Sequence, residues 1–172
     1  MFGHFIPDYM FRHYYEISPE FLRSLGIRSL ILDLDNTLAP YEQPLPDERN
    51  LAWLGELKVA GIDAAFVSNN SSPDRVELFN REIGLPAYFK SGKPSTKNIK
   101  KALADMDCPP ENAAVLGDQI FTDVWAGKRM GMTAIMVPPI KDKRTLFFRF
   151  KRLLEKPFVA KYRKIHGKDF QL

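Results

Sequence analysis

The sequence predicts an α/β fold in which helices cover a three-layer, Rossmann-like parallel sheet. Two observations predict this class. Short apolar segments of strand length alternate along the chain with longer segments whose apolar residues recur at helical spacing. The strand segments are apolar at nearly every position, which is typical of strands with helices on both faces. A chain of 172 residues, 45% of them hydrophobic, is long enough to bury one such core.

Four helices are expected from their boundary residues. Acidic residues open the first helix, and Gly61 ends it. Pro73 lies in the first turn of the second helix, and Gly84 follows its end. Ser95 is expected to cap the third helix. The expected helices are residues 46–61, 71–84, 95–106 and 120–131.

Polar side chains gather where the expected strands end. The expected strands are residues 29–35, 62–70, 87–90, 112–118 and 133–138. In a parallel sheet the carboxyl ends of the strands meet at one edge, and such folds bind ligands there. Asp33 and Asp35 are two residues apart on a strand, so both carboxylates are expected to face the same place. The other polar residues of this edge are Ser68, Asn69, Asn70, Lys93, Gly117, Asp118 and Asp123.

These residues can carry out phosphoryl-transfer chemistry. Neighbouring carboxylates repel unless a cation lies between them, and the three aspartates Asp33, Asp35 and Asp118 make a hard oxygen site that suits Mg²⁺. One aspartate can attack phosphorus, and a second can protonate the leaving oxygen and later deprotonate water. Ser68 and Lys93 offer donors for the phosphoryl oxygens.

Each signal alone also has an ordinary structural interpretation. Paired acids form turns and caps, a serine after a strand often bonds within a loop, and a lysine before proline is commonly a solvated surface residue. The occurrence of all these signals in order, each at a strand end, favours catalysis over separate structural features.

Four segments resemble the motifs of haloacid-dehalogenase (HAD) superfamily phosphatases. They are D-x-D-x-T at 33–37, a strand ending in Ser68, Lys93 followed by Pro94, and GDQIFTD at 117–123. The resemblance implies the HAD fold, with Asp33 as nucleophile and Asp35 as general acid/base.

The same resemblance implies the remaining roles of the site. The implied catalytic residues are Asp33, Asp35 and Lys93, and the implied substrate-binding residues are Thr37, Ser68, Asn69 and Lys93. The implied Mg²⁺ ligands are the Asp33 carboxylate, the Asp35 carbonyl and Asp118, with Asp123 supporting the metal shell.

The spacing of the motifs indicates an open site. HAD enzymes that close over small substrates carry a cap domain between motifs, but Asp33 and Ser68 are 35 residues apart and Ser68 and Lys93 are 25 apart. Neither interval can hold a folded cap in addition to the expected helix and strand. An open site favours a phosphate on something large, such as a lipid, a protein or a nucleic-acid end.

A narrower resemblance suggests a substrate. The segment 7–38, with the GKPS and GDQIFTD segments, is similar to YqeG-type members of HAD subclass IIIA, a group similar to phosphatidylglycerophosphate phosphatases. The resemblance implies hydrolysis of phosphatidylglycerophosphate. Three alternatives stay open: a phosphoprotein substrate, a nucleic-acid end, or a non-catalytic RNA- or ribosome-binding module that uses the basic tail.

The two ends of the chain differ from residues 29–140, the expected HAD-like core. Residues 1–28 are rich in aromatics and are expected to pack on or near the core. Residues 141–172 carry a net charge of +8, while the other 140 residues carry −4. An amphipathic helix at 145–158 is expected, with an apolar stripe of Leu146, Phe147, Phe150, Leu153 and Leu154. Such a helix can contact an anionic membrane, bind RNA, or pack its phenylalanines on the sheet.

The expected location is the cytoplasm, with peripheral contact at the inner face of the membrane. The one cysteine, Cys108, cannot form an internal disulfide, which fits a reducing compartment. The sequence offers no apolar run of membrane-spanning length and no signal-peptide pattern at its start.

Overall fold

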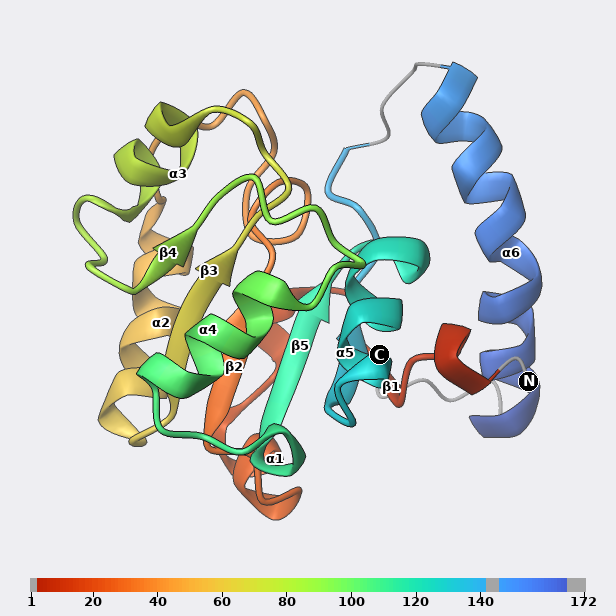
Figure 1. The fold of residues 1–172 in the computed structure, drawn as a ribbon, viewed down its shortest axis with the longest axis horizontal. Coiled ribbons are helices and arrows are strands. Elements are labelled where there is room, and N and C mark those ends of the chain that lie inside the picture. The colour runs from red at the N-terminus through yellow and green to blue at the C-terminus, as the bar shows by residue number, and fades with distance from the viewer. Residues whose placement is uncertain (1–2, 142–145, 167–172) are drawn as a thin grey trace.

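The computed structural model describes residues 3–141 and 146–166, and the side chains of 146–149 lie outside that description. Within these residues, six parallel strands form one sheet in the order β1-β6-β5-β2-β3-β4 (Figure 1). The strands are β1 (Tyr9–Met10), β2 (Ser29–Leu32), β3 (Asp63–Val67), β4 (Ala87–Tyr88), β5 (Ala113–Gly117) and β6 (Thr133–Met136). The α-helices are α1 (Pro19–Ser24), α2 (Glu48–Val59), α3 (Pro73–Asn80), α4 (Lys97–Asp105), α5 (Trp125–Arg129) and α6 (Leu146–His166).

Each face of the sheet is buried under its own layer of helices. Leu30 and Leu32 of β2 point into a core shared with α2 and α3, where Trp53 and Phe79 pack. Ile31, between them, points into the opposite core, under α4, α5 and α6. This alternation explains why the strand is apolar at every position, because both of its faces are covered. The predicted three-layer parallel sheet is confirmed.

The predicted elements occur in order, and the predicted strands and the four predicted helices of the core are shorter at one or both ends. Helix α6 instead extends to His166, beyond the predicted helix 145–158. β2 ends at Leu32, so the predicted strand 29–35 is too long at its carboxyl end. Gly61 ends the first long helix with a φ of 71°, as expected, but the N-cap of α4 is Thr96 and not Ser95. The predicted helix 120–131 begins as a π-helical turn, η4 (Ile120–Val124), before it continues as α5.

The segment before β2 contributes structure that the sequence did not indicate. β1 adds a parallel strand beside β6, with Tyr9 opposite Ile135. The segment also forms a 3-10 turn, η1 (Gly3–Phe5), and another, η2 (Tyr14–Glu16). Tyr14 is buried, and its hydroxyl accepts from the Asn50 side-chain amide at 2.7 Å. The same amide donates to the Leu38 carbonyl at 2.9 Å. A strand of two residues is too short to produce a sequence period, which is why β1 was missed.

Helix α6 lies beside α5, at the end of the molecule opposite α2 and α3 (Figure 1). Its inner face packs Phe158 against Phe5 and Phe121, and Tyr162 is buried. The predicted apolar stripe is exposed where the structure describes it, because Phe150, Leu153 and Leu154 lie away from this inner face. The side chains of Leu146 and Phe147 lie outside the described residues.

The intervals between the motifs contain no additional folded unit. Residues 33–93, all of which the structure describes, hold only α2, β3, α3, β4 and their loops. No helix among the described residues is long and apolar enough to cross a membrane. A short 3-10 turn, η3 (Pro110–Asn112), leads directly into β5.

Candidate active site

Three aspartates from separate parts of the chain meet at the carboxyl edge of the sheet. Asp33 follows β2, Asp118 follows β5, and Asp123 lies in η4. Because β2 and β5 pair in parallel, with Leu32 opposite Leu116, the residues after each strand are neighbours. The three side chains are buried, and their carboxylate oxygens lie within 4.8 Å of one another. The sheet topology therefore brings Asp33 together with Asp118 and Asp123, which lie 85 and 90 residues further along the chain.

Lys93 lies between two of these acids. Its Nζ is 2.7 Å from Asp33 Oδ1 and 2.6 Å from Asp123 Oδ1, and its side chain is buried. The Asn69 amide accepts from the Lys93 backbone N–H at 2.7 Å and donates to its carbonyl at 3.1 Å, which fixes the loop that carries the lysine. Burial lowers the pKa of Lys93, but the carboxylates of Asp123 and Asp33 outweigh burial and raise it overall. The lysine is therefore a permanent cation of the site.

Asp33 is held in one orientation by two donors. The Thr37 hydroxyl donates to Oδ2 at 3.0 Å, and Lys93 donates to Oδ1. Burial raises the pKa of Asp33 to about 7, an effect that Lys93 opposes and that the nearby Asp123 and Asp118 reinforce. Burial and the two neighbouring carboxylates therefore favour the protonated form of Asp33 more than in an exposed aspartate, while the ion pair with Lys93 favours the carboxylate.

Asp35 does not join the three clustered carboxylates. Its side chain accepts from Arg75 Nε at 3.1 Å and from the Asn70 amide at 2.7 Å. Strand alternation does not relate Asp33 to Asp35, because β2 ends at Leu32 and the chain turns at Asn36, where φ is 66°. The expectation that both carboxylates act at one place stays a prediction. The role of the Asp35 carbonyl as a metal ligand stays a prediction.

The residues predicted to bind substrate make contacts that also organise the site. The Ser68 hydroxyl accepts from the Asn70 N–H at 3.1 Å and is buried beside the carboxyl end of β3. Thr37 contacts Asp33, and Asn69 contacts Lys93, so both hold groups that would do chemistry. Their direct contact with a substrate stays a prediction.

Sequence reasoning missed two basic residues of the site. Arg75 lies in the first turns of α3, after the Ser68 loop, a position where a basic residue could have been noticed. Arg152 lies in α6, within a run of basic residues whose sequence does not indicate that one of them pairs with an acid of the site. Its guanidinium donates to the Asp118 carbonyl at 2.6 Å and also pairs with the Asp118 carboxylate. Burial raises the pKa of Asp118 to about 6, and Arg152 opposes this rise.

The donor set fits a hard divalent cation. Buried carboxylate oxygens from three residues are the ligands that Mg²⁺ prefers, and no thiol or imidazole lies among them. Of the predicted metal ligands Asp33, Asp35, Asp118 and Asp123, the structure brings together the carboxylates of Asp33, Asp118 and Asp123. Their roles as ligands stay predictions.

Comparisons with known proteins agree on the family. A family profile described as HAD-hydrolase-like matches residues 90–145. The probable phosphatase YqeG of Bacillus subtilis is 35% identical over 156 residues, which cover 91% of this chain and 90% of YqeG. The chloroplastic phosphatidylglycerophosphate phosphatase 1 of Chlamydomonas reinhardtii is 26% identical over 127 residues, covering 69% of this chain and 47% of that protein.

A solved structure shares the fold. The N-terminal part of protein BF1531 from Bacteroides fragilis, which contains a phosphatase domain and was solved with Mg, superposes with a TM-score of 0.51 at 18% identity. The match covers 76% of this chain and 41% of that one. With four motifs at the strand ends and more than 30% identity to YqeG over nearly all of both proteins, the chain belongs to the HAD-like phosphatase family.

Proposed function

We propose that this chain is a Mg²⁺-dependent phosphomonoesterase that works through an aspartyl-phosphate on Asp33 and acts on an anionic phospholipid, with phosphatidylglycerophosphate as the candidate substrate. The observation that carries the proposal is the buried cluster of Asp33, Asp118 and Asp123 with Lys93 against two of its members. A cluster of acids at a strand edge is costly to maintain unless it serves a charged ligand.

In the first half of the reaction, Asp33 attacks the phosphorus of the substrate. A carboxylate oxygen of Asp33 forms a bond to phosphorus while the bond from phosphorus to the leaving oxygen breaks, and Asp35 gives that oxygen a proton. Thr37 keeps the Asp33 carboxylate oriented. Lys93 offers its charge to the phosphoryl oxygens, whose negative charge grows in the transition state.

In the second half, Asp35 acts as a base. It takes a proton from water, the water oxygen bonds to phosphorus, and the bond to Asp33 breaks to release inorganic phosphate. Arg75 and Asn70 orient the Asp35 carboxylate for this step through contacts at 3.1 and 2.7 Å. The cycle returns both aspartates to their starting states.

The metal would be held by the carboxylates of Asp33, Asp118 and Asp123. When bound, it would supply positive charge to the phosphoryl oxygens. The BF1531 phosphatase domain, which shares the fold, was solved with Mg, and this supports the choice of ion.

Two observations support a lipid substrate. The related Chlamydomonas protein is named a phosphatidylglycerophosphate phosphatase. In addition, residues 33–93 hold no cap that would close the site over a small molecule, within the part of the chain that the structure describes.

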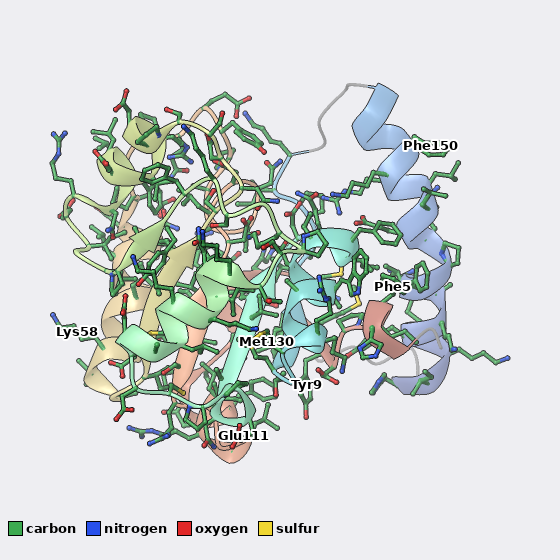
Figure 2. The ribbon with its side chains drawn as sticks, viewed as in Figure 1. Phe5, Tyr9, Lys58, Glu111, Met130 and Phe150 are labelled. Atoms are coloured by element: carbon green, nitrogen blue, oxygen red, sulfur yellow. The ribbon has the colours of Figure 1, made fainter. Side chains whose placement is uncertain are left out.

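The exposed face of α6 supports contact with an anionic membrane. Phe150, Leu153 and Leu154 are 60%, 57% and 46% exposed, and Phe150 lies on the side of α6 away from the sheet (Figure 2). Exposed lysines, including Lys156 and Lys161, lie on the same helix. Apolar side chains beside cations are what an anionic bilayer surface attracts, at about 1 kcal/mol for each cation near the surface.

A phosphate-release assay tests the proposed reaction. Phosphatidylglycerophosphate in vesicles is compared with glycerol 3-phosphate, a phosphopeptide and a 5′-phosphorylated oligonucleotide. Release from the lipid should require Mg²⁺, stop with a chelator, and vanish in Asp33→Asn. The matched control is Asp63→Asn, an exposed aspartate at the opposite end of β3, which should keep full activity. Equal turnover by Asp33→Asn and the wild-type chain would refute the mechanism, and faster release from the peptide or oligonucleotide would refute the lipid substrate.

Vesicle sedimentation tests the membrane contact. The wild-type chain should bind phosphatidylglycerol vesicles at low salt and phosphatidylcholine vesicles weakly. Replacing Phe150, Leu153 and Leu154 together by serine should abolish binding, whereas Val59→Ser should not, although Val59 is 91% exposed on α2. Unchanged binding of the triple variant, or a salt-sensitive RNA shift in place of vesicle binding, would contradict the proposal.

A further inference from the structure

We infer that Arg152 is a positioning residue for the proposed metal site, which fixes the Asp118 carboxylate so that one of its oxygens stays available to a divalent cation. Helix α6 is then a part of the active site and more than an appended tail. The inference rests on the proposed function, because it assigns a task to Asp118 as a metal ligand.

Arg152 contacts both the backbone and the side chain of Asp118. One nitrogen donates to the Asp118 carbonyl at 2.6 Å, and another pairs with the carboxylate oxygen Oδ2. Among the described residues, the second carboxylate oxygen, Oδ1, accepts only one long hydrogen bond, at 3.4 Å from the Gln119 side-chain amide. A carboxylate held through its backbone and one oxygen cannot rotate freely, and its other oxygen keeps lone pairs for a cation.

Glu155 completes the attachment of this loop to α6. It is 2% exposed, accepts from Arg152 at 2.8 Å, and accepts from the Ile120 N–H at 2.9 Å. Lys151 donates to the Gln119 side chain. The three consecutive residues 118–120 are therefore each bonded to residues 151–155 of α6, at the start of the η4 turn that carries Asp123.

The helix has its own anchors away from this loop. Phe158 packs against Phe5 and Phe121, with ring centroids 5.3 and 5.8 Å away. The Tyr162 hydroxyl accepts from the Met10 N–H at 3.1 Å. Because these contacts hold α6 against the N-terminal segment and η4, the position of Arg152 does not depend on Asp118 alone. A rigid support is what a positioning residue needs.

The opposite role for Arg152 would be to exclude metal, since a guanidinium repels a nearby cation. Two features favour positioning. Glu155 is a buried counter-ion that offsets the charge of Arg152, and the contact with Asp118 leaves Oδ1 unblocked. The two roles predict opposite signs: loss of a positioning residue weakens metal binding, whereas loss of an excluding residue strengthens it.

Calorimetric titration of the full-length chain with Mg²⁺, after removal of metal by a chelator, tests this inference. Arg152→Met keeps the aliphatic stem but removes the donors, and it should raise the Kd for Mg²⁺ by roughly 10- to 100-fold, the usual effect of losing a partner that orients a metal ligand. Arg152→Lys should recover part of the affinity. Lys156→Met, an exposed cation on the same helix, should leave the Kd unchanged.

Thermal unfolding in chelator identifies variants that fail to fold. If Arg152→Met does not fold, Glu155→Gln takes its place: its amide oxygen can still accept from Ile120, but the anion that holds Arg152 is lost, and the Kd should again rise. An unchanged or lower Kd in a folded variant overturns the inference. If the wild-type chain shows no Mg²⁺ binding that Asp118→Asn abolishes, the proposed metal site itself fails, so the two failures are distinguishable.

Discussion

Gly117 tests how closely the site is packed. A Cβ at this position would lie 2.3 Å from Asp123 Cγ, 2.4 Å from its Cβ and 2.5 Å from its Oδ2. Ordinary contact begins at 3.4 Å, and Asp123 is 1% exposed, so Gly117→Ala must displace the carboxylate by about 1 Å.

The expected effect on catalysis is large. A displacement of about 1 Å at a group that organises the reacting atoms can lower the rate on the order of 10²-fold. The same overpacking should destabilise the fold by about 1–3 kcal/mol. Activity should therefore fall much further than the folded fraction of the protein.

Gly127→Ala is the matched control. A Cβ at Gly127 would lie 2.2 Å from Val115 Cγ1, a clash of the same size inside the core and away from the acids. Gly127→Ala should lower the free energy of unfolding by a similar amount. The loss should be smaller by up to about 1 kcal/mol, because alanine is more stable than glycine inside a helix. Its effect on kcat should be small, because no group of the site touches it.

The assay combines phosphate release with urea unfolding for both variants and the wild-type chain. The reasoning predicts a kcat near wild type for Gly127→Ala and about 10²-fold lower for Gly117→Ala, measured where both are folded. If the two variants lose activity in proportion to their loss of stability, Asp123 has no place in the catalytic geometry and the reasoning is refuted.

Three further predictions concern the charges of the site. Lys93→Met leaves the buried carboxylates of Asp33 and Asp123 without their cation and should lower the free energy of unfolding in chelator by about 3–5 kcal/mol; a variant as stable as wild type would contradict the buried ion pairs. The pKa values of Asp33 and Asp118, about 7 and about 6, lie above the usual carboxyl value, so both groups bind protons at pH 5. Mg²⁺ must displace these protons, so its affinity should rise from pH 5 to pH 8, by up to about tenfold per pH unit for each proton displaced, and a calorimetric Kd independent of pH would contradict this. In the same range, stability without metal should fall as the pH rises, because the folded state favours the protonated acids.

Much of the fold was predictable from the sequence because its signals are local. Apolar runs, and boundary residues such as Gly61 and Pro73, determine strands and helix ends through neighbouring residues alone. The edge of the sheet was predictable for the same reason, since parallel strands bring their carboxyl ends together whatever lies between them. Asp33, Lys93, Asp118 and Asp123 meet there as expected.

The rest depends on contacts that sequence periodicity does not encode. β2 ends at Leu32, and Asp35 pairs with Arg75 of another element, a contact that strand periodicity does not predict. Arg152 of α6 pairs with Asp118 after β5, 34 residues earlier in the chain. A contact between elements so far apart leaves no pattern in the basic run of α6. The inner face of α6 was not predictable, because buried Glu155 and Tyr162 define it, whereas Phe150 of the predicted apolar stripe is exposed.

Anomalous diffraction from a crystal of the full-length chain grown with Mn²⁺ tests the central claim most directly. The account predicts one strong peak bounded by the carboxylates of Asp33, Asp118 and Asp123. A crystal in which Mn²⁺ binds only at other places would contradict the account. So would a crystal in which Lys93 and Arg152 still pair with the three carboxylates and no peak lies among them.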